Sequence, residues 1–416
     1  MHLLTFVDVL LLLSGVLLLM PSLCLATEIA LSVRKQPDTV RSGSERGGLA
    51  VVVPAHNEAL LIAPTLQSIT AQLRQADRLL VVADNCSDET AAVAAAEGAE
   101  VLVRTDSVRR GKGYALDFAI QRLSSAPPAI VLVIDADCQV APGAIDQLAR
   151  LCTATARPVQ ALYRFRAPEG AALMLRLKEF ACAVKNEARP LGLHRLGLPC
   201  QLMGSGMGFP WAAIATAKLA TGQIVEDLQL GIELARAGTA PLLCTTALIT
   251  SELPATAEGL KSQRARWEHG HLAAIAREGP SLLFASLGRA DWQGVALAAD
   301  LMVPPLALLL LLIAVHWIAS ALFYGTTAAL WPLALSSASA TLLAAAVLVA
   351  WSRYGRHIIP LRSLVLAPLY ALGKTSLYLR IFRARQQVWV RSRRNHEHRD
   401  SSAGPAAQLP GNDRRQ

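Results

Sequence analysis

The sequence predicts an α/β domain that lies between membrane-spanning helices. Of the 416 residues, 53% are apolar and only 17% are charged, whereas a soluble domain has about 45–50% apolar and about 25% charged residues. The mean hydropathy of +0.37 reflects the same excess. Between residues 49 and 134, however, short β-branched runs alternate with segments of helical spacing. The apolar excess is therefore concentrated in separate segments outside an ordinary α/β unit.

Residues 1–26 are predicted to form an N-terminal transmembrane anchor. The run from Leu3 to Leu25 is interrupted only by Asp8 and a few small or polar residues, and about 20 apolar residues suffice to cross the hydrocarbon core. A cleaved signal peptide is the alternative, but such a peptide begins with a basic region, for which His2 is the sole candidate. Residues 27–47 are then expected to be a linker.

Residues 48–290 are predicted to form one domain around a parallel sheet. The expected strands are 49–53, 79–83, 101–103 and 130–134, and the expected helices between them are 61–73, 90–97 and 114–123. Short strands that alternate with helices in this way imply a parallel sheet covered on both faces. In such sheets the ligand binds beyond the carboxyl ends of the strands.

Residues 297–352 are predicted to form a transmembrane helical hairpin. Two apolar runs, 301–324 and 328–351, are joined by the short, uncharged stretch 325–327. The segment 358–382 is apolar but contains Arg362 and Lys374, which favours an interfacial or re-entrant helix over a span. Residues 383–416 are expected to be a basic, partly disordered tail, either bound to anionic lipid headgroups or simply solvated.

The distribution of basic residues predicts the orientation and excludes one class of partner. Arg34 and Lys35 follow the first apolar run, and Arg353 and Arg356 follow the third, so the domain 48–290 is expected to be cytoplasmic in a multi-pass protein of a bacterial inner membrane. A net charge of +9 is compatible with nucleic-acid binding, but no nucleic-acid motif occurs and the cations gather beside apolar segments. The seven cysteines include no C-x-x-C pair, so neither a disulfide framework nor a zinc site is expected.

Acidic residues follow three of the predicted strands. Glu58 follows the first strand, Asp84 the second, and Asp135 and Asp137 the fourth. Any one of them alone is explained as a helix N-cap, but three at the same edge of a sheet favour a site. Two carboxylates at positions i and i+2 can bind one divalent cation, and oxygen ligands suit Mg²⁺ or Mn²⁺.

An ordered set of motifs resembles the family 2 glycosyltransferases of the GT-A fold, a Rossmann-like fold of nucleotide-diphospho-sugar transferases. The set comprises VVVPAHNE (51–58), VVADNCSDET (81–90), RGKG (110–113), DAD (135–137), GSGMGFP (204–210), VED (225–227) and QRARW (263–267). The last string is similar to the Q-x-x-R-W motif of the membrane-embedded branch, the cellulose, chitin and hyaluronan synthases. The resemblance covers residues 48–290, and Val225 stands where family members often have Thr.

The resemblance implies roles for individual residues in transferring a sugar from a nucleotide diphosphate. Asp227 would be the general base that takes the proton of the acceptor hydroxyl, and a single displacement implies inversion at the anomeric carbon. Asp135 and Asp137 would hold Mg²⁺ or Mn²⁺ at the diphosphate. The other implied contacts are donor-binding Glu58, Asp84, Lys112, Asp135 and Arg266, and acceptor-binding Gly204, Ser205, Glu226, Gln263 and Trp267.

Three of these residues have simpler interpretations. Lys112 is also explained as a solvated loop lysine, Asp227 as an acid at a helix N-terminus, and Trp267 as a buried residue of an amphipathic helix. His194, His269 and His271 are expected to be structural or solvated, because no acid–base partner is evident.

The sequence thus predicts a membrane-bound inverting glycosyltransferase, with a UDP-sugar as the expected donor. The favoured acceptor is a growing polysaccharide or exopolysaccharide, and the alternative is transfer of a single sugar to a lipid or lipid-linked acceptor. Three predicted membrane helices leave little wall for a channel unless a homo-oligomer, an export partner or the segment 358–382 contributes. A non-enzymatic nucleotide-binding receptor would predict loss of the catalytic carboxylates, and these are all present.

Overall fold

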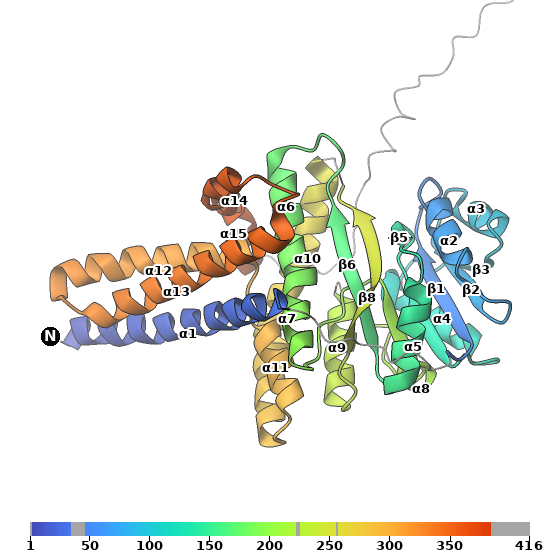
Figure 1. Ribbon diagram of the computed structural model, residues 1–416, viewed down its shortest axis with the longest axis horizontal. Helices are drawn as coiled ribbons and strands as arrows, with labels where there is room; N and C mark the ends of the chain where they lie inside the picture. Colours follow the sequence, from blue (N-terminus) through green and yellow to red (C-terminus); the bar gives the residue numbers. More distant parts are fainter. Residues whose placement is uncertain (1, 35–45, 222–224, 255–256, 384–416) are drawn as a thin grey trace, which may run out of the picture.

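The computed structural model of the protein describes residues 2–34, 46–221, 225–254 and 257–383. Figure 1 shows three regions in a row: a bundle of long helices, a middle layer of helices, and an α/β domain. The chain passes from the bundle to the α/β domain and back, so the bundle contains both N-terminal and C-terminal segments.

The α/β domain is built on one eight-stranded mixed sheet in the order β3-β2-β1-β4-β7-β6-β8-β5. The first four strands in this order are parallel, as predicted, but β7 is antiparallel to both of its neighbours and β5 is antiparallel to β8. The strands are β1 (Leu49–Ala55), β2 (Arg78–Asp84), β3 (Glu100–Arg104), β4 (Ile130–Val133), β5 (Cys138–Val140), β6 (Val159–Arg166), β7 (Met207–Pro210) and β8 (Leu242–Glu252).

Helices cover both faces of this sheet because successive residues of a strand point to opposite faces. Val51 and Val53 of β1 belong to a core with helices on one face, and Ala50 and Val52 to a core with helices on the other. The first face carries α2 (Ile62–Thr70), α3 (Thr90–Ala96) and α5 (Ala144–Thr155), and the second carries α4 (Lys112–Leu123), α8 (Trp211–Ile214) and α9 (Glu226–Arg236).

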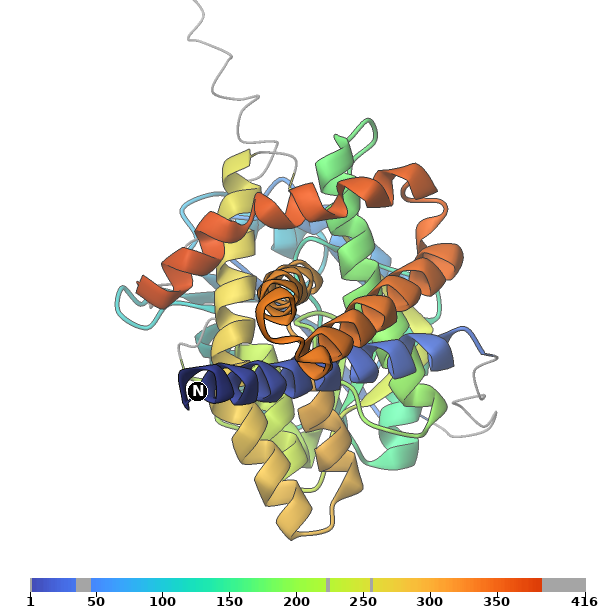
Figure 2. The ribbon, with the colours of Figure 1, turned by 90° about the vertical axis from the view of Figure 1, so that its left-hand side faces the viewer.

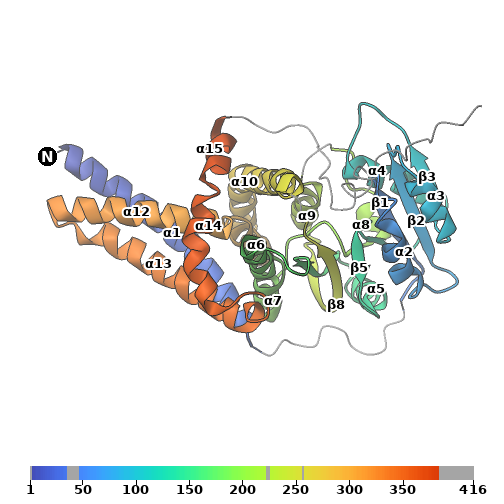
Figure 3. The ribbon, with the colours of Figure 1, turned by 90° about the horizontal axis from the view of Figure 1, so that it is seen from above.

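A layer of helices separates the sheet from the bundle (Figure 3). It contains α6 (Leu173–Ala183), α7 (Arg189–Arg195), α10 (Ala257–Gly288) and α11 (Trp292–Leu301), with one π-helical turn, η1 (Val184–Ala188), between α6 and α7. Such π-turns frequently occur at functional sites.

The bundle consists of α1 (His2–Ser32), α12 (Leu306–Thr327) and α13 (Leu330–Ala350), the last continued by the π-turn η2 (Trp351–Gly355). By length and composition these three helices are able to cross a membrane, at 3–32, 306–327 and 330–355. Helix α1 continues past the predicted anchor, so the first residues of the predicted linker 27–47 are helical. A Cβ on Gly192 of α7 would lie 1.9 Å from the Glu28 carbonyl oxygen, which shows how closely α1 crosses α7.

The segment 358–382 is divided into short pieces: a 3₁₀ turn η3 (Leu361–Leu366), α14 (Ala367–Leu372) and α15 (Thr375–Arg383). Figure 2 shows α14 and α15, in red, running crosswise to α12. None of these pieces is long enough to span a membrane, and the interfacial or re-entrant location of the segment stays a prediction. The predicted tail from residue 384 onward lies outside the described residues.

Candidate active site

Three parallel strands end at one edge of the sheet and place polar groups there. Strands β2, β1 and β4 are neighbours, so Asp84 at the end of β2 and Asp135 just after β4 flank the end of β1. His56, just after β1, lies with its Nδ1 2.6 Å from the carbonyl oxygen of Asp84. The site therefore follows from sheet topology rather than from any single loop.

A cavity of about 290 Å³ lies at this edge and is called the strand-end cavity below. Eight of the residues singled out in the sequence line it, although they come from six separate segments of the chain. These residues are Asp84, Lys112, Asp135, Asp137, Gly204, Glu226, Asp227 and Trp267.

Lys112 lies at the centre of the charged groups. Its Nζ forms an ion pair with Asp135 and donates a hydrogen bond to the carbonyl oxygen of Gly204 at 2.6 Å. Burial alone would lower the pKa of Lys112, but the carboxylates of Asp135, Glu226 and Asp227 raise it above its ordinary value. The lysine is thus a fixed cation in the cavity and not a solvated loop residue.

Asp227 and Glu226 begin helix α9. Asp227 faces Gly204, because a Cβ built on this glycine would lie 3.2 Å from Asp227 Oδ2 and 3.9 Å from Asp135 Oδ2. Burial, and then the charge of Asp227, raise the pKa of Glu226 to about 7, although Lys112 opposes the shift. At neutral pH the pair therefore carries less than its full formal charge.

Asp135 and Asp137 fit a divalent cation. One ligand atom of each, together with Cys138 Sγ, lies within 4.8 Å of the others. Asp137 Oδ2 accepts a hydrogen bond from Ser251 Oγ at 2.9 Å, which orients the carboxylate. Burial raises the pKa of the Cys138 thiol well above its usual range. The two carboxylates offer the oxygen ligands that Mg²⁺ and Mn²⁺ prefer.

Trp267 forms the wall opposite the strand ends. Its ring centroid lies 5.0 Å from that of Phe165, and Lys178 Nζ lies 5.3 Å from its ring centroid. Trp267 is partly buried and packs against the core of the sheet while it also lines the cavity, so both interpretations of this residue stay open. Gln263 and Arg266 belong to the same helix α10, but their side chains lie outside the described residues.

Two predicted site residues lie outside the cavity lining. Ser205 is fully buried, and its Oγ accepts a hydrogen bond from the Asp135 N–H at 3.0 Å. It therefore holds the Asp135 backbone in place and offers no surface to a ligand. Glu58 lies in the turn before α2, where its N–H donates to Thr90 Oγ1 at 2.8 Å. Asp84 does line the cavity, and Arg104 donates to its Oδ1 at 2.6 Å.

Several residues of the cavity had not been singled out from the sequence. Lys185 lies on the π-turn η1, and burial lowers its pKa while the carboxylate of Asp227 opposes this change. Arg189 begins α7 and bridges two carboxylates: it donates to Glu28 of α1 at 2.7 Å and to Asp300 at 2.5 Å. The one signal in the sequence is that Lys185 and Arg189 are four residues apart, which is ordinary for any helix.

His271 is another lining residue that the sequence left as structural or solvated. It is buried, and burial together with Lys185 and Arg189 lowers its pKa well below the ordinary value. The histidine is therefore neutral and contributes no charge to the cavity.

The mixed α/β sheet with acidic strand ends is that of a GT-A-type glycosyltransferase. Residues 46–270, more than half of the chain, match the family described as "Glycosyltransferase like family 2", so the protein belongs to this family. Uncharacterized glycosyltransferases of Mycobacterium tuberculosis and Mycobacterium bovis are 36% identical to it over 122 residues. That alignment covers 28% of this chain, and the chain spans about half (51%) of the length of those relatives.

The chain is also similar to solved structures. A mannosyltransferase from Pyrobaculum calidifontis, in complex with GDP-mannose and Mn²⁺, has a TM-score of 0.50 at 19% identity. The alignment covers 82% of this chain and 99% of that one. Glucosyl-3-phosphoglycerate synthase from Mycobacterium tuberculosis, with Mn²⁺ and UDP, covers 48% of this chain and 71% of its own, at 22% identity and a TM-score of 0.32.

Proposed function

We propose that this protein is a membrane-bound, inverting glycosyltransferase that uses a nucleotide-diphosphate sugar. One observation carries the proposal: Lys112, Asp135 and Asp227 gather around Gly204 in a single cavity at the strand ends. This arrangement places a cation for a leaving diphosphate beside a carboxylate that is able to accept a proton.

The reaction follows from these positions. The acceptor hydroxyl loses its proton to Asp227 as its oxygen attacks the anomeric carbon of the donor. The bond from this carbon to the diphosphate breaks, and the electron pair leaves on the β-phosphate oxygen. Lys112 stabilises that charge, and Asp135 and Asp137 would hold Mg²⁺ or Mn²⁺, which supplies further neutralisation there. One displacement from the face opposite the leaving group inverts the anomeric configuration.

The remaining contacts of the donor and acceptor belong to the same proposal. Asp84 and Glu58 are proposed to contact the nucleoside, and Arg266 the diphosphate. Gly204, Glu226, Gln263 and Trp267 are proposed to contact the acceptor, with Ser205 as a positioning residue behind Asp135. UDP is the expected nucleotide, and GDP is the second to test because the mannosyltransferase of similar fold was solved with GDP-mannose.

The location and acceptor class complete the proposal. The cations that flank α1 and α13 favour the cytoplasmic side of a bacterial inner membrane. Two acceptors are compatible with this location, a growing polysaccharide and a lipid or lipid-linked saccharide. The string QRARW favours the polysaccharide, and a large apolar cavity between the long helices favours the lipid or lipid-linked saccharide.

A screen of nucleotide sugars tests the function. Membranes that contain the full chain are incubated with labelled UDP- and GDP-sugars, with Mg²⁺ or Mn²⁺ or with a chelator. We expect transfer of label from one donor, loss of transfer with the chelator, and an inverted anomeric configuration by NMR. Transfer that persists after chelation contradicts the proposed metal site, and a retained configuration contradicts the single displacement.

A further inference from the structure

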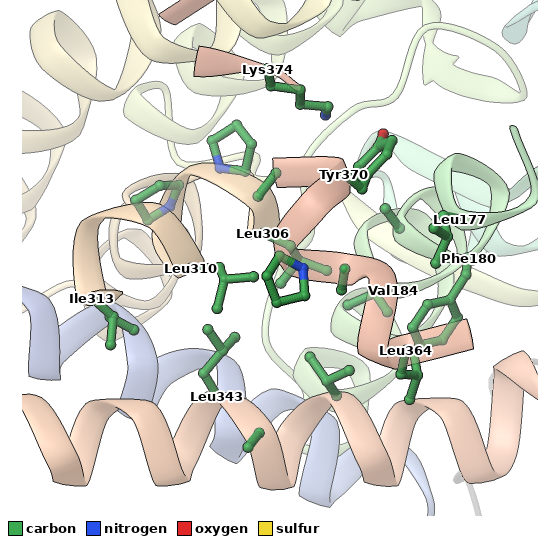
Figure 4. Close-up of a pocket in the computed structure, with 18 of the residues that line it drawn as sticks. Leu177, Phe180, Val184, Leu306, Leu310, Ile313, Leu343, Leu364, Tyr370 and Lys374 are labelled. Atoms are coloured by element: carbon green, nitrogen blue, oxygen red, sulfur yellow. The ribbon is translucent and has the colours of Figure 1, made fainter. Parts of the chain in front are cut away.

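A second cavity, called the helix cavity below, lies between the long helices and the middle layer and has a volume of about 1,210 Å³. This exceeds the range of about 300–1,000 Å³ that is typical of small-molecule sites. Its walls are apolar side chains of α6, α12, α13 and the segment η3–α14. Figure 4 shows Leu310, Ile313 and Leu343 together in the cavity, with Lys374 and Tyr370 at the opposite end.

The helix cavity adjoins the strand-end cavity. Five residues line both of them: Cys182, Lys185, Arg189, Trp267 and His271. A molecule that fills the helix cavity therefore ends beside the residues that surround Asp227.

The helix cavity is also open to the side. Five apolar residues of its lining are between 44% and 79% exposed, and they come from α12, α13 and η3: Trp317, Ile318, Leu348, Leu361 and Val365. An opening with such a rim lies between two helices that are able to cross a membrane. An apolar molecule that enters between them stays out of water along its whole path.

The charged residues of the lining are mostly cations. Five of the six charged residues that line the helix cavity are cations, and Glu268 is the exception. Glu268 accepts from Lys374 at 2.5 Å, and Arg189 is paired with Glu28 and Asp300.

Lys185 differs from these paired cations. It has no hydrogen-bond or ion-pair partner among the described residues, and its side chain is exposed to the two cavities. Its location at the junction puts a cation near Asp227 and on the walls of both cavities.

We propose that the helix cavity binds the acceptor of the reaction, a lipid whose headgroup carries a phosphate and the acceptor hydroxyl. The proposal rests on the function proposed above and names its acceptor class. The apolar chain lies along α12 and α13, the phosphate contacts Lys185, and the hydroxyl reaches Asp227. A polysaccharide chain fits this cavity poorly, because its hydroxyl groups would lose water without gaining partners. An apolar helix of a second copy would fill the walls but leave Lys185 without an anion.

Transfer of the sugar to this lipid forms one bond to the anomeric carbon and breaks one. The hydroxyl oxygen of the lipid headgroup bonds to the anomeric carbon, its proton goes to Asp227, and the nucleoside diphosphate leaves with the electron pair. The lipid phosphate is not consumed, and no further reactant is needed. The product stays in the membrane because its apolar chain is unchanged.

Photo-crosslinking tests where the lipid binds. Vesicles of phosphatidylcholine contain the full chain and either a diazirine-tagged phosphatidic acid or the matching diacylglycerol. We expect the phosphatidic acid to label α12, α13 and η3, and to label them more than the diacylglycerol does. Ala344→Trp fills the cavity and is expected to reduce labelling about tenfold, which corresponds to about 1.4 kcal/mol. Ala345→Trp is the matched control, because Ala345 is its exposed neighbour on α13 but does not line the cavity.

Two further variants test the headgroup contact. Lys185→Gln removes the charge and is expected to weaken labelling by phosphatidic acid about tenfold, while labelling by diacylglycerol is unchanged. Lys185→Arg keeps the charge and is expected to retain the preference for the anionic lipid. Equal labelling of Ala344→Trp and Ala345→Trp, or an unchanged preference in Lys185→Gln, would overturn the proposal.

The transfer assay separates this inference from the function on which it rests. After reaction with the labelled donor, sugar that partitions into the organic phase supports a lipid acceptor. Label in a water-soluble polymer refutes the lipid acceptor but keeps the glycosyltransferase. Absence of nucleotide-sugar binding refutes both, and cross-links between two chains through α12 and α13 refute the lipid occupant in favour of a second copy.

Discussion

The strand-end cavity gathers charged side chains at the ends of neighbouring strands, whereas the helix cavity is lined mainly by apolar side chains of helices. In the first, Lys112 and Asp135 are paired and Ser205 supports the backbone of Asp135. In the second, apolar side chains form most of the lining, and Lys185 is one of the charged residues that it shares with the strand-end cavity. The difference matches the two roles that we propose, a charged reaction in the strand-end cavity and an apolar ligand in the helix cavity.

The largest expected effect concerns the reaction itself. Asp227→Asn removes the proton acceptor but keeps the size of the side chain, so we expect turnover to fall by about 10²–10⁴-fold. Nucleotide-sugar binding, measured by calorimetry, should persist because Lys112 and Asp135 remain. Glu233→Gln, farther along α9, is the control and should keep wild-type turnover. Full activity of Asp227→Asn would show that the strand-end cavity is not organised around this base.

The next effect concerns the residue that lines both cavities and ties them to α1. Arg189→Met leaves Glu28 and Asp300 buried without their shared cation, which is expected to lower the free energy of unfolding by about 3–5 kcal/mol. Thermal unfolding in detergent measures the loss. Arg150→Met breaks a more exposed pair with Asp146 and is expected to change stability by less than about 1 kcal/mol. Similar unfolding temperatures for the two variants would contradict the importance of the buried network.

A smaller effect separates backbone strain from contact with the base. Gly204 has φ +94° and Gly238 has φ +83°, but only a Cβ at Gly204 would meet other groups, Asp227 Oδ2 among them. Each change to Ala is expected to destabilise the fold by about 1–3 kcal/mol through the left-handed backbone. Only Gly204→Ala should also reduce turnover. Equal turnover of both variants would remove Gly204 from the strand-end site.

The smallest effect is a pH dependence of stability. The pKa of Glu226 is raised from 4.5 to about 7 in the folded state, so between these values the folded protein binds a proton that the unfolded chain has lost. Stability should therefore fall as pH rises through this window. Glu226→Gln is expected to reduce that fall in thermal melts at several pH values, whereas Glu233→Gln should not. A fall of the same size in Glu226→Gln would place its cause elsewhere.

The first half of the fold was predictable because its signals are local. Each strand of the β3-β2-β1-β4 half has its β-branched run and its flanking helix within about 25 residues, and all four lie where predicted. The antiparallel β7 was not predicted, because its partners β4 and β6 are separated from it by long stretches of chain. The segment 358–382 was predicted as one interfacial or re-entrant helix, and its division into η3, α14 and α15 was not predicted.

The candidate site residues also divide into those with a local sequence signal and those without one. Asp84, Asp135 and Asp227 were recognised because motifs and strand ends surround them in the sequence. Lys185 and Arg189 carry no such pattern, and their role depends on where α6 and α7 pack between the sheet and the bundle. The helix cavity was also invisible in the sequence, because apolar residues that line a cavity are the same types that fill a core.

The close crossing of α1 and α7 affects the distance between Asp227 and a bilayer around α1. A side chain at Gly192 would collide with the backbone of Glu28, so α7 packs directly against α1 at this point. With α1 in a bilayer, Asp227 is held at a constant height above the lipid surface. For the lipid acceptor that we propose, the length of the headgroup would then decide whether its hydroxyl reaches Asp227.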